Sequence, residues 1–211
     1  MMTKLKPILD FLFPPTGLDR TIAALTAKQL LSRSALFEKD NVLAFFRYDD
    51  ELIKRMVWKL KYRGDAAIAA LFAESVYDVL VEELSDHALF RGFAQPLLVP
   101  IPLGKKRLRE RGYNQAEIFA HALETQNHIL STTEAHLLLK IRETAPQTTL
   151  PKKARETNIL RAFAVSRPQE VNGKSILLID DVTTTGSTFR EARKVLEEAG
   201  ARCVVCLAIA H

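Results

Sequence analysis

The feature that most constrains the fold is an apolar run that stops abruptly at two acids. Residues 176–179 show no polar alternation, which is typical of a strand buried on both faces of a parallel sheet. Asp180 and Asp181 follow directly, and apolar side chains then recur at helical spacing over residues 189–199. The stretch therefore predicts a strand, a polar loop and a helix in direct succession.

The loop between this strand and this helix is rich in hydroxyl side chains. After Val182 it consists of Thr183, Thr184, Thr185, Gly186, Ser187 and Thr188. Backbone N–H groups and the dipole at a helix start favour an anion, hydroxyls add donors, and a glycine permits close approach. The two preceding carboxylates repel phosphate but accept hydrogen bonds from a sugar diol. Together these groups predict a site for a ribose 5-phosphate.

A simpler interpretation of the same loop stays open. Thr188 and Glu191 have the spacing of a capping box, in which a threonine-rich turn does no more than cap the helix. Capping requires one hydroxyl and no neighbouring acids. The two acids therefore favour a ligand site over a cap.

The rest of the chain alternates apolar runs with helical periods, which predicts an α/β fold around a parallel sheet. We expect residues 97–101, 137–141, 176–180 and 203–209 to be strands of this sheet. Further strands are expected at residues 42–48 and 162–165, and helices at residues 51–61, 66–84 and 115–126. The predicted organisation is an N-terminal arm over residues 1–45 and a single domain over residues 46–211.

A basic segment follows the short strand at residues 97–101. Its cations include Lys105, Arg107, Arg109 and Arg111. Doubly wound sheets bind ligands at the carboxyl ends of parallel strands, and a pyrophosphate would need such countercharge there. The alternative is a solvated basic turn. The position directly after a strand favours these four side chains as pyrophosphate ligands.

Residues 142–159 combine few apolar side chains with two prolines and alternating threonines and basic residues. This composition predicts a long loop that is poorly ordered without ligand and closes over a bound phosphate. Lys153 and Arg155 are the cations that such a lid would bring to the ligand. The alternative is a solvated loop that never touches the site.

Composition excludes several other classes of function. The net charge of +5 suits phosphorylated ligands or nucleic acid, and it identifies neither. Cys203 and Cys206, the only cysteines, lie on a predicted strand and point to opposite faces, so they cannot share a metal. Neither a P-loop nor a dinucleotide fingerprint occurs. No bilayer-spanning segment or cleavable signal is expected, which favours a reducing cytoplasm.

The string over residues 176–188 resembles the signature of the type I phosphoribosyltransferases, which bind 5-phosphoribosyl-1-pyrophosphate (PRPP). The resemblance implies that Asp180 and Asp181 hold the ribose hydroxyls and that residues 184–188 hold the 5-phosphate. In the hypoxanthine-guanine branch a base-contacting Asp occupies the position of Thr184. A purine salvage enzyme of that branch is therefore not expected.

Within that superfamily most of the chain resembles the competence protein F (ComF) family. The matching segments are residues 12–15 (LFPP), 61–65 (KYRGD), 99–102 (VPIP) and 111–115 (RGYNQ), with Arg142, Thr144, Gln147, Leu150, Arg155, Asn158, Ala162 and Phe163. Family members usually carry a four-cysteine zinc knuckle after the first segment. This chain has no cysteine there, so we expect no bound zinc.

The resemblance implies a cytoplasmic PRPP-binding protein that is linked, in competent bacteria, to the uptake of single-stranded DNA. The leading hypothesis is a transferase that takes PRPP with Mg²⁺ and releases pyrophosphate. One rival is a PRPP-binding adaptor without turnover, since no general base stands out. Another is a nucleic-acid-binding protein, for which Tyr62 and Tyr113 are the only aromatic candidates near basic runs. Any hood over the site is expected to come from residues 1–95.

Overall fold

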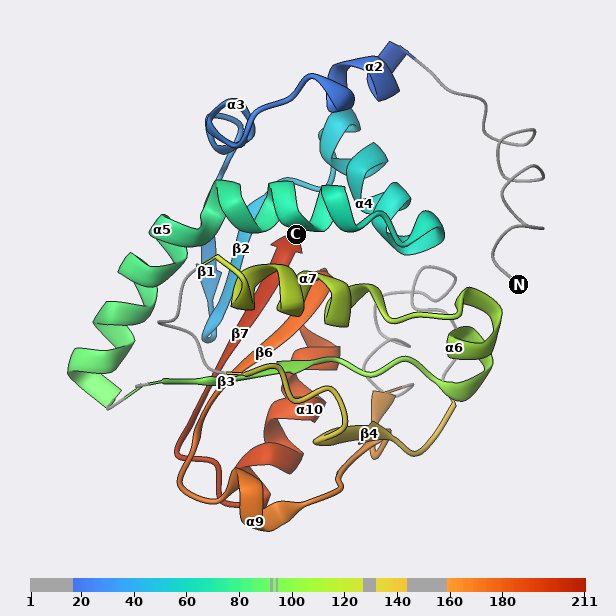
Figure 1. The fold of residues 1–211 in the computed structure, drawn as a ribbon. Coiled ribbons are helices and arrows are strands. Elements are labelled where there is room, and N and C mark those ends of the chain that lie inside the picture. The colour runs from blue at the N-terminus through green and yellow to red at the C-terminus, as the bar shows by residue number, and fades with distance from the viewer. Residues whose placement is uncertain (1–16, 92, 94, 127–131, 144–158) are drawn as a thin grey trace.

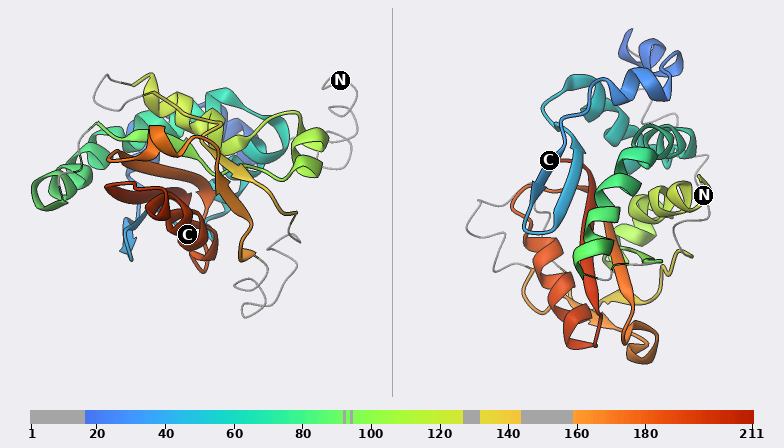
Figure 2. Two further views of the ribbon diagram at one scale, coloured as in Figure 1. Left: turned by 90° about the horizontal axis from the view of Figure 1, so that it is seen from below. Right: turned by 90° about the vertical axis from the view of Figure 1, so that its left-hand side faces the viewer.

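The computed structural model describes residues 17–91, 93, 95–126, 132–143 and 159–211 (Figure 1). The apolar N-terminal stretch and most of the predicted lid, including Lys153 and Arg155, lie outside these ranges. In the described ranges a mostly parallel sheet is packed between two layers of helices (Figure 2). The predicted α/β class with a parallel core is therefore confirmed.

The central sheet has five strands in the order β1, β2, β7, β6 and β3. Their bounds are β1 (Phe37–Lys39), β2 (Val42–Phe46), β3 (Leu97–Pro100), β6 (Ser175–Val182) and β7 (Cys203–Ala210). All neighbours pair in parallel except β1, which is the antiparallel edge strand beside β2. The apolar run that ends in two acids is β6, and it lies inside the sheet between β3 and β7.

Helices cover both faces of the sheet. Their bounds are α2 (Gly17–Ala23), α3 (Ala27–Leu31), α4 (Glu51–Arg63), α5 (Ala66–Arg91), α6 (Lys105–Arg111), α7 (Gln115–Glu124), α9 (Pro168–Val171) and α10 (Ser187–Glu198). In Figure 2, α5 and α7 lie on one face and α10 on the other. Leu177 and Ile179 pack with the first pair, and Ile176 and Leu178 pack with α10. Alternate residues of β6 thus fill two cores, which explains the absence of polar positions.

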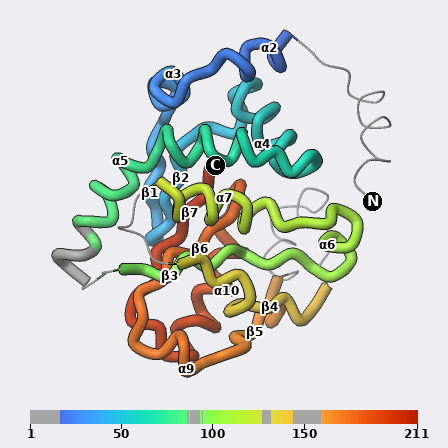
Figure 3. Tube along the Cα trace, in the orientation of Figure 1, coloured from blue at the N-terminus to red at the C-terminus, as the bar shows by residue number. Residues whose placement is uncertain are grey.

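The strand expected at residues 137–141 is not part of the parallel sheet, so this prediction is wrong. Residues Leu138–Lys140 form β4, which pairs antiparallel with β5 (Phe163–Val165) in a separate two-stranded sheet (Figure 3). The physical reason is that β4 has only one buried face. Leu138 packs on the core beneath α10, whereas Leu139 is 42% exposed.

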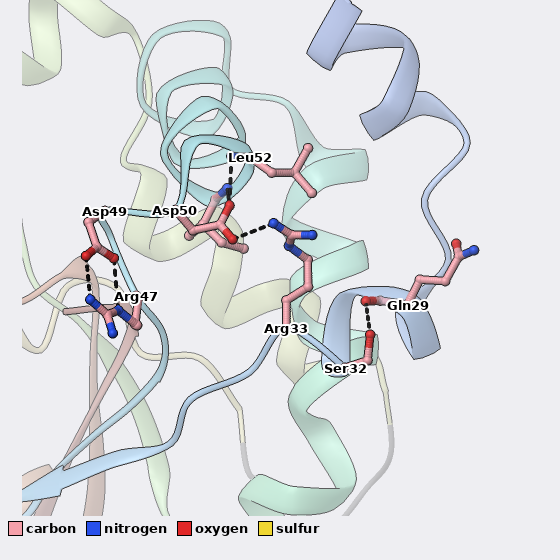
Figure 4. Close-up of polar contacts among 8 residues, drawn as sticks. Gln29, Ser32, Arg33, Arg47, Asp49, Asp50 and Leu52 are labelled. Carbon is pink, nitrogen blue, oxygen red and sulfur yellow. Dashed lines mark hydrogen bonds and ion pairs between the residues drawn. The ribbon is translucent and has the colours of Figure 1, made fainter.

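The N-terminal elements pack at the end of the sheet where β7 finishes (Figure 1). Asp19 of α2 forms ion pairs with Arg55 (2.8 Å) and Lys59 (3.2 Å) of α4. Asp50 caps α4 through the N–H of Leu52 and binds Arg33, with 2.6 Å between Nη2 and Oδ2 (Figure 4). Residues 17–33 and α4 therefore form the cover over the carboxyl ends of the strands.

Two other sequence features can be placed in the fold. The predicted boundary at residue 45 falls within β2, whose Leu43 pairs with Leu207 of β7, and the division into arm and domain stays a prediction. Cys203 contacts the core beneath α5 and α7, and Cys206 lies in the core beneath α10. The two thiols are on opposite faces of β7, as predicted.

Candidate functional site

The two acids at the end of β6 lie in different surroundings. Asp180 is half-buried and lines a pocket at the carboxyl end of the strand, while Asp181 is only 4% exposed. Each carboxylate accepts a hydrogen bond from the next backbone N–H, at 2.8 Å. Consecutive strand residues point to opposite faces, so the two acids enter different environments.

The pocket beside Asp180 is formed by the hydroxyl-rich loop. Its lining consists of Asp180, Val182, Thr183, Thr184, Gly186, Ser187, Thr188 and Phe189. Asp181 and Thr185 are not part of this lining. Thr185 instead holds the loop, because its Oγ1 donates to Ser187 Oγ (3.0 Å) and its carbonyl accepts from Arg190 (3.1 Å). Most of the predicted phosphate-binding residues are therefore brought together around one hollow.

Gly186 begins α10 without a side-chain cap. Its φ of 67° lies in the left-handed region, which glycine adopts at little cost. The capping box of Thr188 and Glu191 is not formed, because Glu191 accepts a hydrogen bond from the backbone N–H of Arg161. The capping alternative therefore does not explain the loop, and the helix start faces the pocket lining.

Lys61 is a site residue that the local sequence did not identify. It lies in the last turn of α4, and its Nζ is 3.1 Å from Asp181 Oδ2. Burial is the largest single influence and would lower the pKa of Lys61, but the combined attraction of Asp181, Tyr48 and Asp180 outweighs burial and the pKa is raised. A lysine in an amphipathic helix gives no signal of such a partner, which lies 120 positions away along the chain. Only its place in the KYRGD segment set it apart.

The pKa of the Asp180 carboxyl is unusually high. Burial, followed by the neighbouring charge of Asp181, raises its pKa to about 8, against a partial offset from Lys61. Lys140 of β4 is nearby, and its pKa is lowered by burial and by Arg107, with Asp180 acting in the opposite direction. Lys140 is thus a cation close to the pocket-facing acid, and Arg107 is a second cation close to Lys140.

The predicted basic loop is in fact a short helix, α6, which extends beyond β3 (Figure 1). Lys105 and Arg109 are exposed on it. Arg107 is half-buried, and its buried Nη2 has no hydrogen-bond partner among the described residues. Arg111 donates to Gln115 (2.9 Å) and lies over the ring of Tyr62 at 5.0 Å. Of the four predicted pyrophosphate ligands, Arg107 is the one whose charge acts on Lys140, the neighbour of Asp180.

Two of the sequence segments meet at the end of α4. The hydroxyl of Tyr113 donates to the carbonyl of Lys61 (3.1 Å), and its ring lies against Gly64. A Cβ at Gly64 would be 2.9 Å from the Tyr113 ring, and φ there is 59°. The amide of Asn114 donates to the carbonyl of Ile101 (3.0 Å) after β3. Residues 61–65 and 111–115 therefore form one support beneath the acids.

Comparison with known proteins now adds independent findings. The family model described as "Phosphoribosyl transferase domain" matches residues 117–211. The chain is 28% identical to "Competence protein ComFC" of Bacillus subtilis (strain 168), over 94% of this chain and 76% of that protein. It is 27% identical to "DNA utilization protein YhgH" of Escherichia coli (strain K12), over 92% and 81% respectively. It is also 30% identical to "Competence protein F" of Haemophilus influenzae, over 71% and 64%.

The chain is similar to ComF proteins over most of its length and has the phosphoribosyltransferase fold. The matched region includes β6, the hydroxyl-rich loop and α10, so it contains the pocket described above. The ComF resemblance predicted from the sequence is thereby confirmed. The ligand roles of individual residues stay predictions.

Two further expectations concern membrane-spanning helices and bound metal ions. In the part of the chain that the structure describes, no helix is long and apolar enough to cross a membrane. Among the same residues, no group of three or more His, Cys, Asp or Glu side chains is placed to hold a metal ion. The expected absence of zinc stays a prediction.

Proposed function

We propose that this protein binds PRPP at the carboxyl end of β6 and transfers its ribosyl group to a nucleophile, with release of pyrophosphate. The observation that carries the proposal is the pocket in which Asp180 faces a hydroxyl-rich loop at the uncapped start of α10. The loop suits a 5-phosphate and the acid suits a ribose diol. The phosphoribosyl transferase match over residues 117–211 supports the same assignment.

Arg107 and Lys140 are our candidates for the pyrophosphate. Negative charge grows on the departing oxygens in such a transfer, so nearby cations lower the barrier by neutralising it. In the described part of the chain the buried Nη2 of Arg107 is a donor without an acceptor, which an incoming phosphate oxygen would supply. Lys153 and Arg155 keep their predicted role as cations of the lid.

Magnesium fits this site as a cation carried by the ligand. The described residues offer no cage of several acidic side chains, and Mg²⁺ commonly binds through substrate phosphates while keeping several waters. When bound, it would supply charge neutralisation to the pyrophosphate. The protein's own residues would bind the ribose and the 5-phosphate, orient them and exclude water.

A second candidate is a PRPP-binding adaptor in the handling of single-stranded DNA. The names of the relatives, "Competence protein ComFC" and "DNA utilization protein YhgH", favour this role. The cytoplasm stays the location that we propose. Among the described residues, Asp180 is the only acidic or basic side chain in the pocket lining, so these residues offer no separate base there for an acceptor. In this case the protein would bind PRPP and release no pyrophosphate.

Calorimetry with PRPP and Mg²⁺ tests the ligand site directly. In buffer above about pH 8, where Asp180 is ionised, replacing Asp180 and Asp181 together by Asn removes hydrogen bonds to charged acceptors, each worth about 1.5–3 kcal/mol, so we expect affinity to fall at least about tenfold. Glu170→Gln is the matched control, because its ion pair with Arg167 (2.9 Å) lies on α9, before β6 begins. Equal affinities for the double variant and the control would contradict the ribose assignment.

Turnover is tested separately by measuring pyrophosphate release from PRPP with a panel of nucleobases and amines. Release that depends on one acceptor class supports the transferase. PRPP binding with no release across the panel, with or without single-stranded DNA, supports the adaptor.

A further inference from the structure

The adjacent acids of β6 differ in what they face. Asp180 lines the pocket together with the hydroxyl-rich loop. The side chain of Asp181 is 5% exposed, lies outside that lining and faces α4. A ligand in the pocket would therefore meet Asp180 first, although the two acids are neighbours in sequence.

Lys61 is the partner of Asp181 on the buried side. Its Nζ lies 3.1 Å from Asp181 Oδ2, and the side chain is 20% exposed. It also lies over the ring of Tyr48, at 5.8 Å from the centroid. An ion pair removed from water to this degree leaves an uncompensated charge when either partner is lost.

The backbone around Lys61 is held in place by a second contact. Its carbonyl accepts the Tyr113 hydroxyl at 3.1 Å, and α4 ends three residues later at Gly64, where the Tyr113 ring packs. Lys61 is therefore anchored to the segment that follows α6 as well as to Asp181. The ion pair joins α4 to the strand end on which the pocket is built.

We infer that the two acids have different roles, and that Lys61 is a positioning residue of the ribose site. This inference rests on the proposed function. Asp180 contacts the ribose hydroxyls, whereas Asp181 pairs with Lys61 and fixes the strand end from behind. The pair also compensates the charge of Asp181, which would otherwise act on Asp180 and repel an anionic ligand.

Three variants separate this arrangement from two equivalent ribose acids. Asp180→Asn removes the acid that faces the ligand, Lys61→Met leaves Asp181 without its partner, and Lys61→Met with Asp181→Asn replaces the ion pair by a neutral pair. We expect Asp180→Asn and Lys61→Met each to weaken PRPP binding at least about tenfold, as for loss of a charged hydrogen-bond partner. The neutral pair should stay within about fivefold of wild type, since replacing both partners of a buried pair is often neutral.

A matched control exists on the same helix. Lys59 pairs with Asp19 at 3.2 Å and is 14% exposed, so Lys59→Met also breaks a buried ion pair, away from β6. Its PRPP affinity should stay within about twofold of wild type, which separates positioning from a general loss of stability. Lys61→Arg should restore affinity toward the wild-type value, because it keeps the charge opposite Asp181.

A ligand-free readout covers the case in which Lys61→Met folds poorly or PRPP does not bind. The charges that act on Asp180 are Asp181 and Lys61, and Lys140 interacts with Asp180 as well as with Glu143 and Arg107. Carbon-13 NMR of the Asp180 carboxyl should show a higher titration midpoint in Lys61→Met than in wild type, and an unchanged midpoint in Lys59→Met. In the variant with the neutral pair, Asp180 should titrate at lower pH than in wild type. The charge of Asp181 raises the pKa of Asp180 more than the charge of Lys61 lowers it, and both charges are gone.

The outcomes are distinguishable. Affinity in the neutral pair as low as in Asp180→Asn would show that Asp181 contacts the ligand directly and would overturn the inference. The same Asp180 midpoint in Lys61→Met and wild type would also overturn it. No PRPP binding by wild type refutes the proposed function, and the carboxyl titration still decides the pairing of Lys61 with Asp181.

Discussion

Replacing Asp180 by Asn should make the protein more stable in alkaline buffer. Burial and the charge of Asp181 raise the pKa of Asp180 from 3.8 to about 8, so ionising this side chain opposes folding. The folded state holds this proton between these two values while the unfolded state has lost it. Stability of the wild type should therefore decline as pH rises through this window and level off above about pH 8.

The size of the effect follows from the shift. A pKa that rises from 3.8 to about 8 corresponds to about 6 kcal/mol across the window. Asp180 is half-buried and lines an open pocket, so solvent screens part of this cost. We expect Asp180→Asn to gain roughly 2–3 kcal/mol relative to wild type between about pH 5 and about pH 9.

Urea unfolding of both proteins across this pH range measures the difference directly. Glu170→Gln is the control, because its carboxylate lies in an exposed ion pair with Arg167 and should leave the pH dependence unchanged. If the stabilities of wild type and Asp180→Asn keep a constant separation from acid to alkali, the buried environment assigned to Asp180 is incorrect.

Other predictions follow from single contacts. Gly186→Ala should lower stability by about 1–2 kcal/mol in thermal melts, because alanine is strained at a φ of 67° although no atom lies within 4 Å. Gly64→Ala should cost more than Gly186→Ala, since it adds a contact of 2.9 Å with Tyr113, and shortening Tyr113 should recover part of the loss. Burial raises the pKa of Cys206 to about 11, so a thiol reagent at neutral pH should modify Cys203 before Cys206 until urea is added. Elemental analysis of purified protein should find no stoichiometric zinc, and about one zinc per chain would contradict this.

The sequence alone determined the architecture around the site. The run of residues 176–179 has no polar position because both faces of β6 are covered, so its apolar composition predicts this burial. The hydroxyl-rich loop and its glycine also predict an anion site from the sequence, because a helix start that binds an anion needs donors and a small residue at fixed positions. These features are local, and a few consecutive residues carry them.

The tertiary structure decided what depends on neighbours in space. Three consecutive leucines at residues 137–139 suggested an interior strand, but which sheet a strand joins depends on its partners, and β4 pairs with β5. The basic segment suggested four equivalent cations, and its folding into α6 leaves Arg107 half-buried near Lys140 while Lys105 and Arg109 face solvent. Helix rotation, which depends on packing, separates these side chains.

The two acids show the same limit most clearly. The sequence shows that they are adjacent and charged, and its resemblance to the phosphoribosyltransferases predicts that both hold the ribose hydroxyls. Alternation along β6 directs Asp180 to the pocket and Asp181 to Lys61, which is brought there by the packing of α4 at the end of the sheet. Sequence determined that two carboxylates end the strand, and long-range packing decided which of them a ligand can reach, because burial and countercharge come from residues distant in the chain.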